Sequence, residues 1–558
     1  MEYSSRKIVV LVVFGAAALL CVLRWWQLGR PVELPNAPEG RLACVSYTPA
    51  WQPEAPGAEI TPAQIDVDLR RLANRFRCVR TYAVTRGMDA VPAVARKYGM
   101  KVLLGVWIGP DAADNEMQIR IATRLAGDNA DVIKAIIVGN EVLLRHEQSE
   151  AALRGYLERV HAATHLPVSY ADVWEFWLRR PGLAGAVSFI TIHILPYWEN
   201  NPVSVDAALD HTREVYAKTS RQFPGKHVLI GETGWPTAGR PRAGAVPSRI
   251  NAARYIREFT RYAADHQLDY NLIEAYDQPW KRLAEGTVGG FWGLYDARGE
   301  AKYGLQGPVR EVEDWQRGLQ AALAAALLFM IAGAGIPPRA GRPAMILLAT
   351  AGVITGATLT AQYDYLANDS RDAIEWLLSG AGTAWGWLAF LLILSAFKSW
   401  LDGRAALPRI ASIGETIAVF RHGGQWSMSR MLGLLRFGLL AGMSYLNLGL
   451  VLDGRYRNFP ITLLVLPVTS IALVEAIRAR DTVSRARLAP EELLMVWWLP
   501  LAGLLLIAVE RGLNCAAWSW AALCLLLAGG TCDWRRPEAG EQQRAQQQSQ
   551  PGREVAVK

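Results

Sequence analysis

The stretch HVLIGETGWP (227–236) and the earlier stretch AIIVGNEV (135–142) decide the fold that we expect for this chain. Each contains an apolar run followed closely by a glutamate, Glu232 in the first and Glu141 in the second. Continuous apolar runs of this length are typical of strands buried in a parallel sheet. A lone glutamate is more often a solvated surface residue. Two at equivalent strand ends favour a shared site, because the carboxyl ends of barrel strands form the mouth where active sites are built.

Strand-like and helix-like segments alternate from residue 40 to residue 315. Helical stretches such as Pro62–Arg75 and Ser248–His266 separate the apolar runs, and Thr61 before Pro62 looks like a helix cap followed by proline at the first helical position. Eight βα units in a region of this length predict a (β/α)8 TIM barrel, with Glu141 and Glu232 at the ends of strands 4 and 7. The expected strands are ACVSY (43–47), CVRTY (78–82), KVLLGVWI (101–108), AIIVGNEV (135–142), PVSYADV (167–173), FITIHIL (189–195), HVLIGET (227–233) and NLIEAY (271–276).

The second half of the chain has a different composition. Residues 317–532 are dominated by apolar runs of roughly membrane-spanning length, several of them at the short end of that range. They predict an α-helical transmembrane bundle rather than buried helices of a soluble domain. The expected spans are Leu319–Ile336, Ala344–Ala361, Ile374–Phe397, Met431–Leu452, Ile461–Ile477, Leu493–Val509 and Ala516–Gly530.

The first 30 residues have the pattern of an uncleaved signal anchor. Arg6 and Lys7 precede an apolar run from Ile8 to Leu23, and no small-residue cleavage site follows that run. Trp25 and Trp26 come soon after it, where a membrane interface is expected. The anchor places the N-terminus inside and the barrel outside the cytoplasm.

The distribution of charge agrees with this orientation. With the barrel outside, the inner loops and the C-terminal tail hold 16 Lys and Arg residues, and the outer loops hold 4. This asymmetry follows the positive-inside rule. The net charge of +8 therefore reflects membrane topology and gives no reason to expect a nucleic-acid partner. The predicted domains are an N-terminal signal anchor (1–30), a periplasmic barrel domain (31–315), a seven-span region (316–532) and a disordered cytoplasmic tail (533–558).

The six cysteines form no CxxC pair and show no zinc-ligand spacing. Cys44 and Cys78 lie near the starts of two adjacent predicted strands, in a compartment that we expect to be oxidising. A disulfide between them is one of two alternatives, since the sequence does not give their distance. We expect no metal and no cofactor.

Five stretches of the barrel region together resemble glycoside hydrolase family 17, the β-1,3-glucanase-like barrels. They are RTYAV (80–84), VGNEVLLR (138–145), IGETGWPTAG (230–239), EAYDQPWK (274–281) and EGTVGGFWGLYD (285–296). The resemblance implies a retaining mechanism with Glu141 as general acid/base and Glu232 as nucleophile. Such a mechanism needs the two carboxyl groups about 5–5.5 Å apart. We expect burial and the negative neighbour to keep Glu141 protonated at rest.

Further residues are expected to bind the sugar. Asn140 is placed to hydrogen-bond the sugar 2-hydroxyl. Trp235 and Trp280 are the favoured stacking platforms, whereas Trp174, Trp177, Trp198, Phe291 and Trp292 fit either outlying subsites or core packing. The family resemblance also implies a carboxylate–lysine–carboxylate group in the stretch that contains Glu274. The remaining candidates are Tyr82, Asp172, His193, Tyr197, Asp277, Lys281 and Glu285, with Arg80 beside them on strand 2.

The favoured function is a membrane-anchored glucosyltransferase (transglycosylase) that cleaves and re-joins β-1,3-glucan chains. An endo-1,3-β-glucanase is the main alternative, and a non-catalytic glucan-binding or export accessory is a third. A nucleotide-sugar-dependent synthase is disfavoured, because the longest internal loop, 398–430, is too short for its cytoplasmic domain. Proteobacterial members of the family suggest a bacterial inner membrane. The expected partners are a β-glucan, the lipid bilayer and a glucan synthase in the same membrane, beside which the seven spans serve as a scaffold or a polymer-handling platform.

Overall fold

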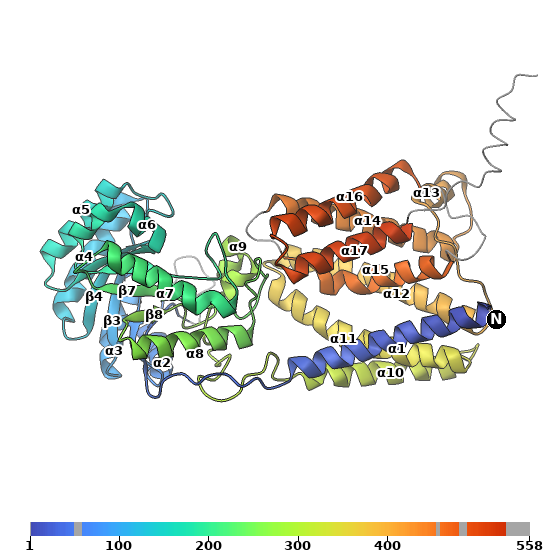
Figure 1. Cartoon of the computed structure of the whole chain (residues 1–558), viewed down its shortest axis with the longest axis horizontal. Coiled ribbons are helices and arrows are strands. Elements are labelled where there is room, and N and C mark those ends of the chain that lie inside the picture. Colours follow the sequence, from blue (N-terminus) through green and yellow to red (C-terminus); the bar gives the residue numbers. More distant parts are fainter. Residues whose placement is uncertain (1, 50–58, 454–457, 479–487, 532–558) are drawn as a thin grey trace, which may run out of the picture.

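A computed structural model describes residues 2–49, 59–453, 458–478 and 488–531 (Figure 1). It contains a β-barrel and a helical region that lies at one end of the barrel, with α1 (Glu2–Leu28) running along that helical region. The predicted disordered tail, 533–558, lies outside the described residues.

The barrel is closed by eight parallel strands in sequential order, with β8 paired to β1. This confirms the predicted (β/α)8 fold. The apolar runs mark the strands because both faces of a parallel sheet are covered. Strand β8 ends earlier than the predicted strand 271–276, because the chain leaves the sheet after Leu272. The strands are β1 (Leu42–Ser46), β2 (Phe76–Arg80), β3 (Lys101–Val106), β4 (Ile133–Asn140), β5 (Val168–Val173), β6 (Ile190–His193), β7 (Val228–Thr233) and β8 (Tyr270–Leu272).

Helices cover the outside of the barrel. Thr61 caps α2 as predicted: its hydroxyl accepts the Gln64 N–H, and the Gln64 side chain accepts the Thr61 N–H. The α-helices are α2 (Pro62–Leu72), α3 (Val91–Lys97), α4 (Ala112–Asp128), α5 (Glu150–Ala163), α6 (Trp174–Arg179), α7 (Val205–Gln222), α8 (Arg249–Asp265) and α9 (Arg282–Glu285). Short 3-10 helices are η1 (Met88–Ala90), η2 (Pro181–Ala186), η3 (Pro279–Lys281) and η4 (Thr287–Gly290).

Cys44 and Cys78 are bonded as a disulfide between β1 and β2. The two residues are direct partners in the parallel register, and their Cα atoms are 4.4 Å apart. Both side chains are buried, and they pack with Leu103 and Ala135. Of the two alternatives that the sequence leaves open, the structure has the bonded one.

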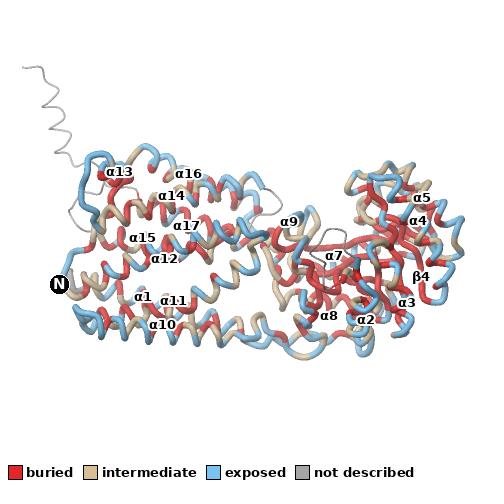
Figure 2. The backbone as a smooth tube through the Cα atoms, turned by 180° about the vertical axis from the view of Figure 1, so that it is seen from behind, coloured by how far each residue is buried: buried red, intermediate tan, exposed pale blue. Residues whose placement is uncertain are grey.

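The helical region contains every one of the seven expected spans. Among the residues that the structure describes, α1 and six helices of this region are long and apolar enough to cross a membrane, and α17 is apolar but slightly shorter. Figure 2 shows many exposed residues along the outer faces of these helices, and large apolar side chains such as Leu328 and Leu378 are among them. The helices are α10 (Gln316–Gly335), α11 (Arg342–Asp369), α12 (Ala373–Leu401), α14 (Met428–Leu452), α15 (Ile461–Arg478), α16 (Pro490–Val509) and α17 (Cys515–Thr531).

One helix was not predicted from the sequence. Within the loop 398–430, α13 (Ile413–His422) begins after Ser412, whose side chain accepts the Glu415 N–H. Ile413 and Val419 are buried, so this short helix packs one face against its neighbours. Its ten residues are too few and too mixed in polarity to stand out from a loop.

Trp25 is packed inside the helical region, and its ring does not lie free on the surface as an interfacial anchor would. Its side chain is 4% exposed, and the indole N–H donates to the Ala357 carbonyl at 3.1 Å. The ring occupies space that Gly318 leaves free, because a Cβ on Gly318 would lie 2.1 Å from it. Trp26, by contrast, is 48% exposed and keeps the expected position at the surface. Trp25 therefore joins α1 to α10 and α11.

We expect Trp25→Ala to destabilise the helical region, and Trp26→Ala to leave it unchanged. The first variant loses ring packing and a buried hydrogen bond, which together are worth about 1 kcal/mol or more. The measurement is the midpoint temperature of thermal unfolding of the full chain in detergent, monitored by the loss of monodisperse protein. Equal midpoints for the two variants would show that α1 is not held by this contact.

Candidate active site

The end of β4 is bent so that Glu141 enters the barrel mouth. Gly139 and Glu141 both have positive φ, 81° and 54°, and the β4–β5 register shifts between Ile137 and Asn140. The Glu141 N–H still donates to the Ala171 carbonyl at 2.8 Å, which fixes the bend. A left-handed conformation at a residue other than glycine costs about 1 kcal/mol or more and is concentrated at functional sites.

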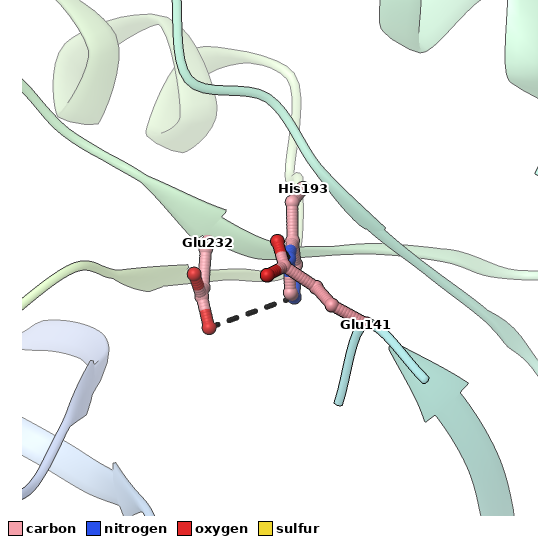
Figure 3. A group of neighbouring side chains, drawn as sticks. All are labelled: Glu141, His193 and Glu232. Atoms are coloured by element: carbon pink, nitrogen blue, oxygen red, sulfur yellow. Dashed lines mark hydrogen bonds and ion pairs between the residues drawn. The ribbon is translucent and has the colours of Figure 1, made fainter. Parts of the chain in front are cut away.

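Glu141 and Glu232 converge in the mouth, with His193 between them (Figure 3). The Glu141 Oε1 atom lies 2.9 Å from His193 Nδ1, and Glu232 Oε1 lies 3.6 Å from His193 Nε2. One oxygen of each carboxylate lies within 4.8 Å of the other. This separation suits a retaining pair and is shorter than the 6.5–9.5 Å or so that an inverting pair requires.

Arg80 and Tyr82 hold Glu232 in place. Arg80 Nη1 donates to Glu232 Oε1 at 3.1 Å and to the Gly231 carbonyl at 2.9 Å. The Tyr82 hydroxyl donates to the same carboxylate oxygen at 2.8 Å. Arg80 Nη2 also donates to Asn140 Oδ1 at 2.6 Å, so it joins β2, β4 and β7. Arg80, which we treated as a minor candidate, is therefore central to the site.

Two supporting residues were missed by the sequence analysis. Ser46 Oγ lies 2.8 Å from the Tyr82 hydroxyl, and it accepts a hydrogen bond from Asn271 Nδ2 at 2.7 Å. Asn271 Nδ2 also donates to the Gly231 carbonyl at 2.8 Å. The sequence did contain a signal for both residues: Ser46 is polar at the end of β1, and Asn271 is polar within β8. Polar side chains at such positions need partners inside the barrel.

The electrostatics of Glu141 differ from our expectation. Burial raises its pKa, but the hydrogen bond and charge of His193, with the charges of Arg145 and Arg80, outweigh burial and hold that pKa below its usual range. This direction is opposite to the one that we expected from burial and the negative neighbour. The cause lies in three basic groups from β2, β6 and the segment after β4, whose convergence only the fold reveals.

Asp172 is buried beside the site and does not reach the cleft. The Tyr170 hydroxyl donates to its Oδ2 atom, and the Val173 N–H donates to Oδ1 at 2.7 Å. Burial raises the pKa of Asp172 to about 6, with the charge of Glu141 adding to the effect. The same Tyr170 hydroxyl accepts the Leu143 N–H at 3.0 Å. The expectation that Asp172 binds sugar is corrected: it stabilises the chain beyond β4.

The acidic and basic residues after β8 form two separate groups. Lys281 Nζ donates to Glu274 Oε1 at 2.6 Å, and Glu285 lies close enough for the Lys281 charge to act on it. Burial nevertheless raises the pKa of Glu285 to about 7. Asp277 instead pairs with Lys302 at 2.6 Å and accepts the Gly293 N–H. Asp277 therefore has its own ion pair and backbone hydrogen bond, separate from the Lys281 group.

The aromatic residues divide into buried ones and ones that face solvent or the cleft, and this division differs from our expectation. Trp235 is 1% exposed and donates to the Val246 carbonyl, and Tyr197 is fully buried beside it. Neither has a ring face open to a sugar, so both expectations are corrected. Trp280 is 54% exposed, so its ring is accessible as a platform. Trp198 lines a cleft of about 100 Å³ together with Glu141, His193, Phe176, Glu175 and Glu199.

Of the side chains in the described ranges, Glu141, His193 and Glu232 form a group whose ligand atoms are close enough to hold a metal ion. Arg80 already places a permanent positive charge 3.1 Å from Glu232 Oε1 and 3.4 Å from His193 Nε2. A second cation beside the guanidinium would be repelled. The arrangement suits two carboxylates that act on a substrate better than it suits a metal.

A closed (β/α)8 barrel with two carboxylates at the ends of β4 and β7 has the arrangement of a glycoside hydrolase domain. The family model described as the BtgE/BtgC glycoside hydrolase domain matches residues 44–293. The barrel is therefore similar to glycoside hydrolase domains over most of its length.

Individual relatives agree with this class. The chain is 27% identical over 271 residues to a glucan 1,3-β-glucosidase of Arthroderma benhamiae, a match that covers 45% of this chain and 87% of the relative. It is 28% identical over 304 residues to a putative glucan endo-1,3-β-glucosidase, btgC, of Aspergillus niger, covering 47% and 43%. Among solved structures, it is similar to a family 17 β-1,3-glucanosyltransferase of Rhizomucor miehei, at 24% identity, a TM-score of 0.42 and coverage of 47% and 97%.

Proposed function

We propose that the protein is a retaining β-1,3-glucan-active enzyme, and specifically a glucosyltransferase that cleaves and re-joins glucan chains. The observation that carries this proposal is the close pair of carboxylates, Glu141 and Glu232, with oxygens within 4.8 Å. The names of the relatives, which include glucan 1,3-β-glucosidases and a β-1,3-glucanosyltransferase, support the choice of substrate.

The reaction proceeds in two displacements. Glu232 attacks the anomeric carbon and forms a glycosyl ester, while Glu141 gives its proton to the departing glycosidic oxygen. Arg80 and Tyr82 orient the Glu232 carboxylate for this attack. In the second step an acceptor hydroxyl attacks the same carbon, Glu141 takes the hydroxyl proton, and the ester bond breaks. The lowered pKa of Glu141 suits this second step, in which it acts as a base.

A sugar acceptor gives transfer, and water gives hydrolysis. Trp198 on the cleft and the exposed Trp280 offer rings on which an acceptor sugar stacks, which favours transfer. An endo-1,3-β-glucanase remains the second candidate, because the relatives include putative enzymes of that name. A non-catalytic accessory is the third.

We place the protein in a bacterial inner membrane, as a multi-pass protein with the barrel on the periplasmic side. Exposed leucines on the helices, such as Leu327, Leu494 and Leu504, support a lipid environment, because a soluble protein rarely exposes so many. The Cys44–Cys78 disulfide supports an oxidising compartment for the barrel. The excess of basic residues in the loops and tail assigned to the cytoplasm supports the same orientation. A glucan synthase in that membrane is the partner that fits this location.

The first prediction assigns the two carboxylates. Glu232→Ala and Glu141→Ala should each lower turnover of an aryl β-1,3-gluco-oligosaccharide by about three orders of magnitude or more. Azide should restore activity to both, but with opposite products. Azide replaces the nucleophile in Glu232→Ala and gives an α-glycosyl azide, whereas in Glu141→Ala it attacks the glycosyl ester and gives the β-anomer.

Proton NMR of the purified azide products distinguishes the two anomers. Glu300→Gln, which changes an exposed carboxylate in the segment after η4, is the matched control and should keep wild-type turnover. Wild-type rates in Glu232→Ala, or the same anomer from both variants, would contradict the assigned roles.

The second prediction separates transfer from hydrolysis. The full chain is incubated in detergent with a β-1,3-gluco-oligosaccharide of one length, and products are followed by mass spectrometry. We expect products longer than the substrate, and linkage analysis then identifies the bond formed. Only shorter products would establish a hydrolase, and an unchanged substrate would argue against a β-1,3-glucan enzyme.

The third prediction concerns pH. Because kcat/KM requires protonated Glu141, activity falls as pH rises through its pKa. His193 contributes to holding that pKa low, so His193→Asn should move the alkaline limb of the kcat/KM profile to higher pH. His266→Asn, at an exposed position after α8, is the control and should leave the limb in place. A limb that moves to lower pH in His193→Asn would refute this account of Glu141.

A further inference from the structure

Three consecutive loops of the barrel mouth touch the helical region. After β6, Asn201 Oδ1 accepts a hydrogen bond from Arg511 at 3.0 Å. After β8, Arg282 Nη1 donates to the Asn368 carbonyl at 2.9 Å. After β7, the contacts are with Glu510 and Asn514, on the turn between α16 and α17. Figure 1 shows α9, from the loop after β8, between the barrel and the helical region. The barrel mouth that holds the two carboxylates thus contacts the ends of helices in the helical region.

The contact after β7 is the most buried of the three. Glu510 Oε2 accepts the Ala243 N–H at 3.0 Å, and Asn514 Nδ2 donates to the Pro241 carbonyl at 3.1 Å. Asn514 Nδ2 also donates to Glu510 Oε2 at 3.1 Å, so the two side chains act together. The Glu510 carboxylate lies 3.9 Å from Arg240, and both side chains are nearly inaccessible to solvent. A buried charge needs such partners, so this contact is specific.

The segment from Arg240 to Ala243 also contacts a wall of the cleft. The Tyr197 hydroxyl donates to the Arg240 carbonyl at 2.7 Å, and Arg242 Nη1 donates to the Tyr197 carbonyl at 2.8 Å. The Arg242 guanidinium lies 5.7 Å from the Trp198 ring. Trp198 itself lines the cleft with Glu141 and His193. A continuous set of contacts therefore links Glu510 to an aromatic ring at the active site.

We propose that Glu510 and Asn514 are positioning residues for sugar binding, which fix the segment 240–243 and through it the Trp198 wall of the cleft. The helical region then completes the enzyme instead of only tethering it. This inference rests on the proposed β-glucan activity. Ala243 shows the need for an external clamp, because its φ of 47° is unfavourable for alanine and its N–H is held by Glu510.

The test uses the full chain in nanodiscs, with β-1,3-gluco-oligosaccharides of three and six units. In Glu510→Ala we expect KM for the longer substrate to rise about five- to tenfold, the size of a typical coupling between sites, with kcat within about twofold of wild type. Glu510→Gln keeps an acceptor for the Ala243 N–H but loses the charge near Arg240, so its effect should be smaller. Asn514→Ala should resemble Glu510→Ala. Glu491→Ala, an exposed glutamate at the other end of α16, is the matched control and should behave as wild type.

Hydrogen–deuterium exchange provides a readout that does not depend on turnover. In Glu510→Ala the amides of residues 234–248 should exchange faster than in wild type, while those of β1 to β3 stay protected. Unchanged KM with unchanged exchange would overturn the inference, as would a loss of kcat at constant KM. The wild-type chain could be inactive on these substrates while Glu510→Ala still shows faster exchange. That result would support the role of Glu510 in fixing segment 240–243 and would refute the proposed substrate. If Glu510→Ala does not fold, Glu510→Gln and Asn514→Ala carry both measurements.

Discussion

A buried guanidinium organises the mouth of this barrel. Arg80 is 1% exposed, and an unpaired charge in that position would cost several kcal/mol. It is stabilised by Glu232, the Gly231 carbonyl and Asn140, which come from β7 and β4. The strand ends must therefore adopt the register that brings these acceptors together. The same constraint orients the Glu232 carboxylate and places positive charge beside it, so the fold and the proposed chemistry depend on one side chain.

The strands and membrane-length helices were predictable because their signals are local. A strand covered on both faces must be apolar throughout, and the runs ending at Glu141 and Glu232 show this directly. The convergence of the two glutamates followed from strand order alone. The short helix α13 was missed because ten residues of mixed polarity give a weak periodic signal. The positions of the reactive groups were thus available from sequence, while their surroundings were not.

The rest of the site depends on distant contacts that no local pattern encodes. Trp235 follows the Glu232 strand closely, yet Tyr197, Tyr255 and the Val246 carbonyl enclose it. Trp198 was an equal candidate for core packing and instead lines the cleft. Sequence spacing likewise could not decide that Lys281 pairs with Glu274 and Lys302 with Asp277. Each outcome is set by loops that meet only when the barrel closes.

The contacts between the barrel mouth and the helical region give a physical reason for having more helices than an anchor needs. A single span anchors a protein, but it leaves the barrel free to rotate about its linker. Contacts at two separate helix ends, near Asn368 at the end of α11 and Glu510 at the end of α16, remove that freedom. The cleft then keeps a fixed height and direction relative to the helix ends. Under the proposed function, a fixed cleft would lower the entropic cost of aligning a glucan chain with Glu141 and Glu232. On that proposal, the helices that hold the barrel also help to orient the substrate.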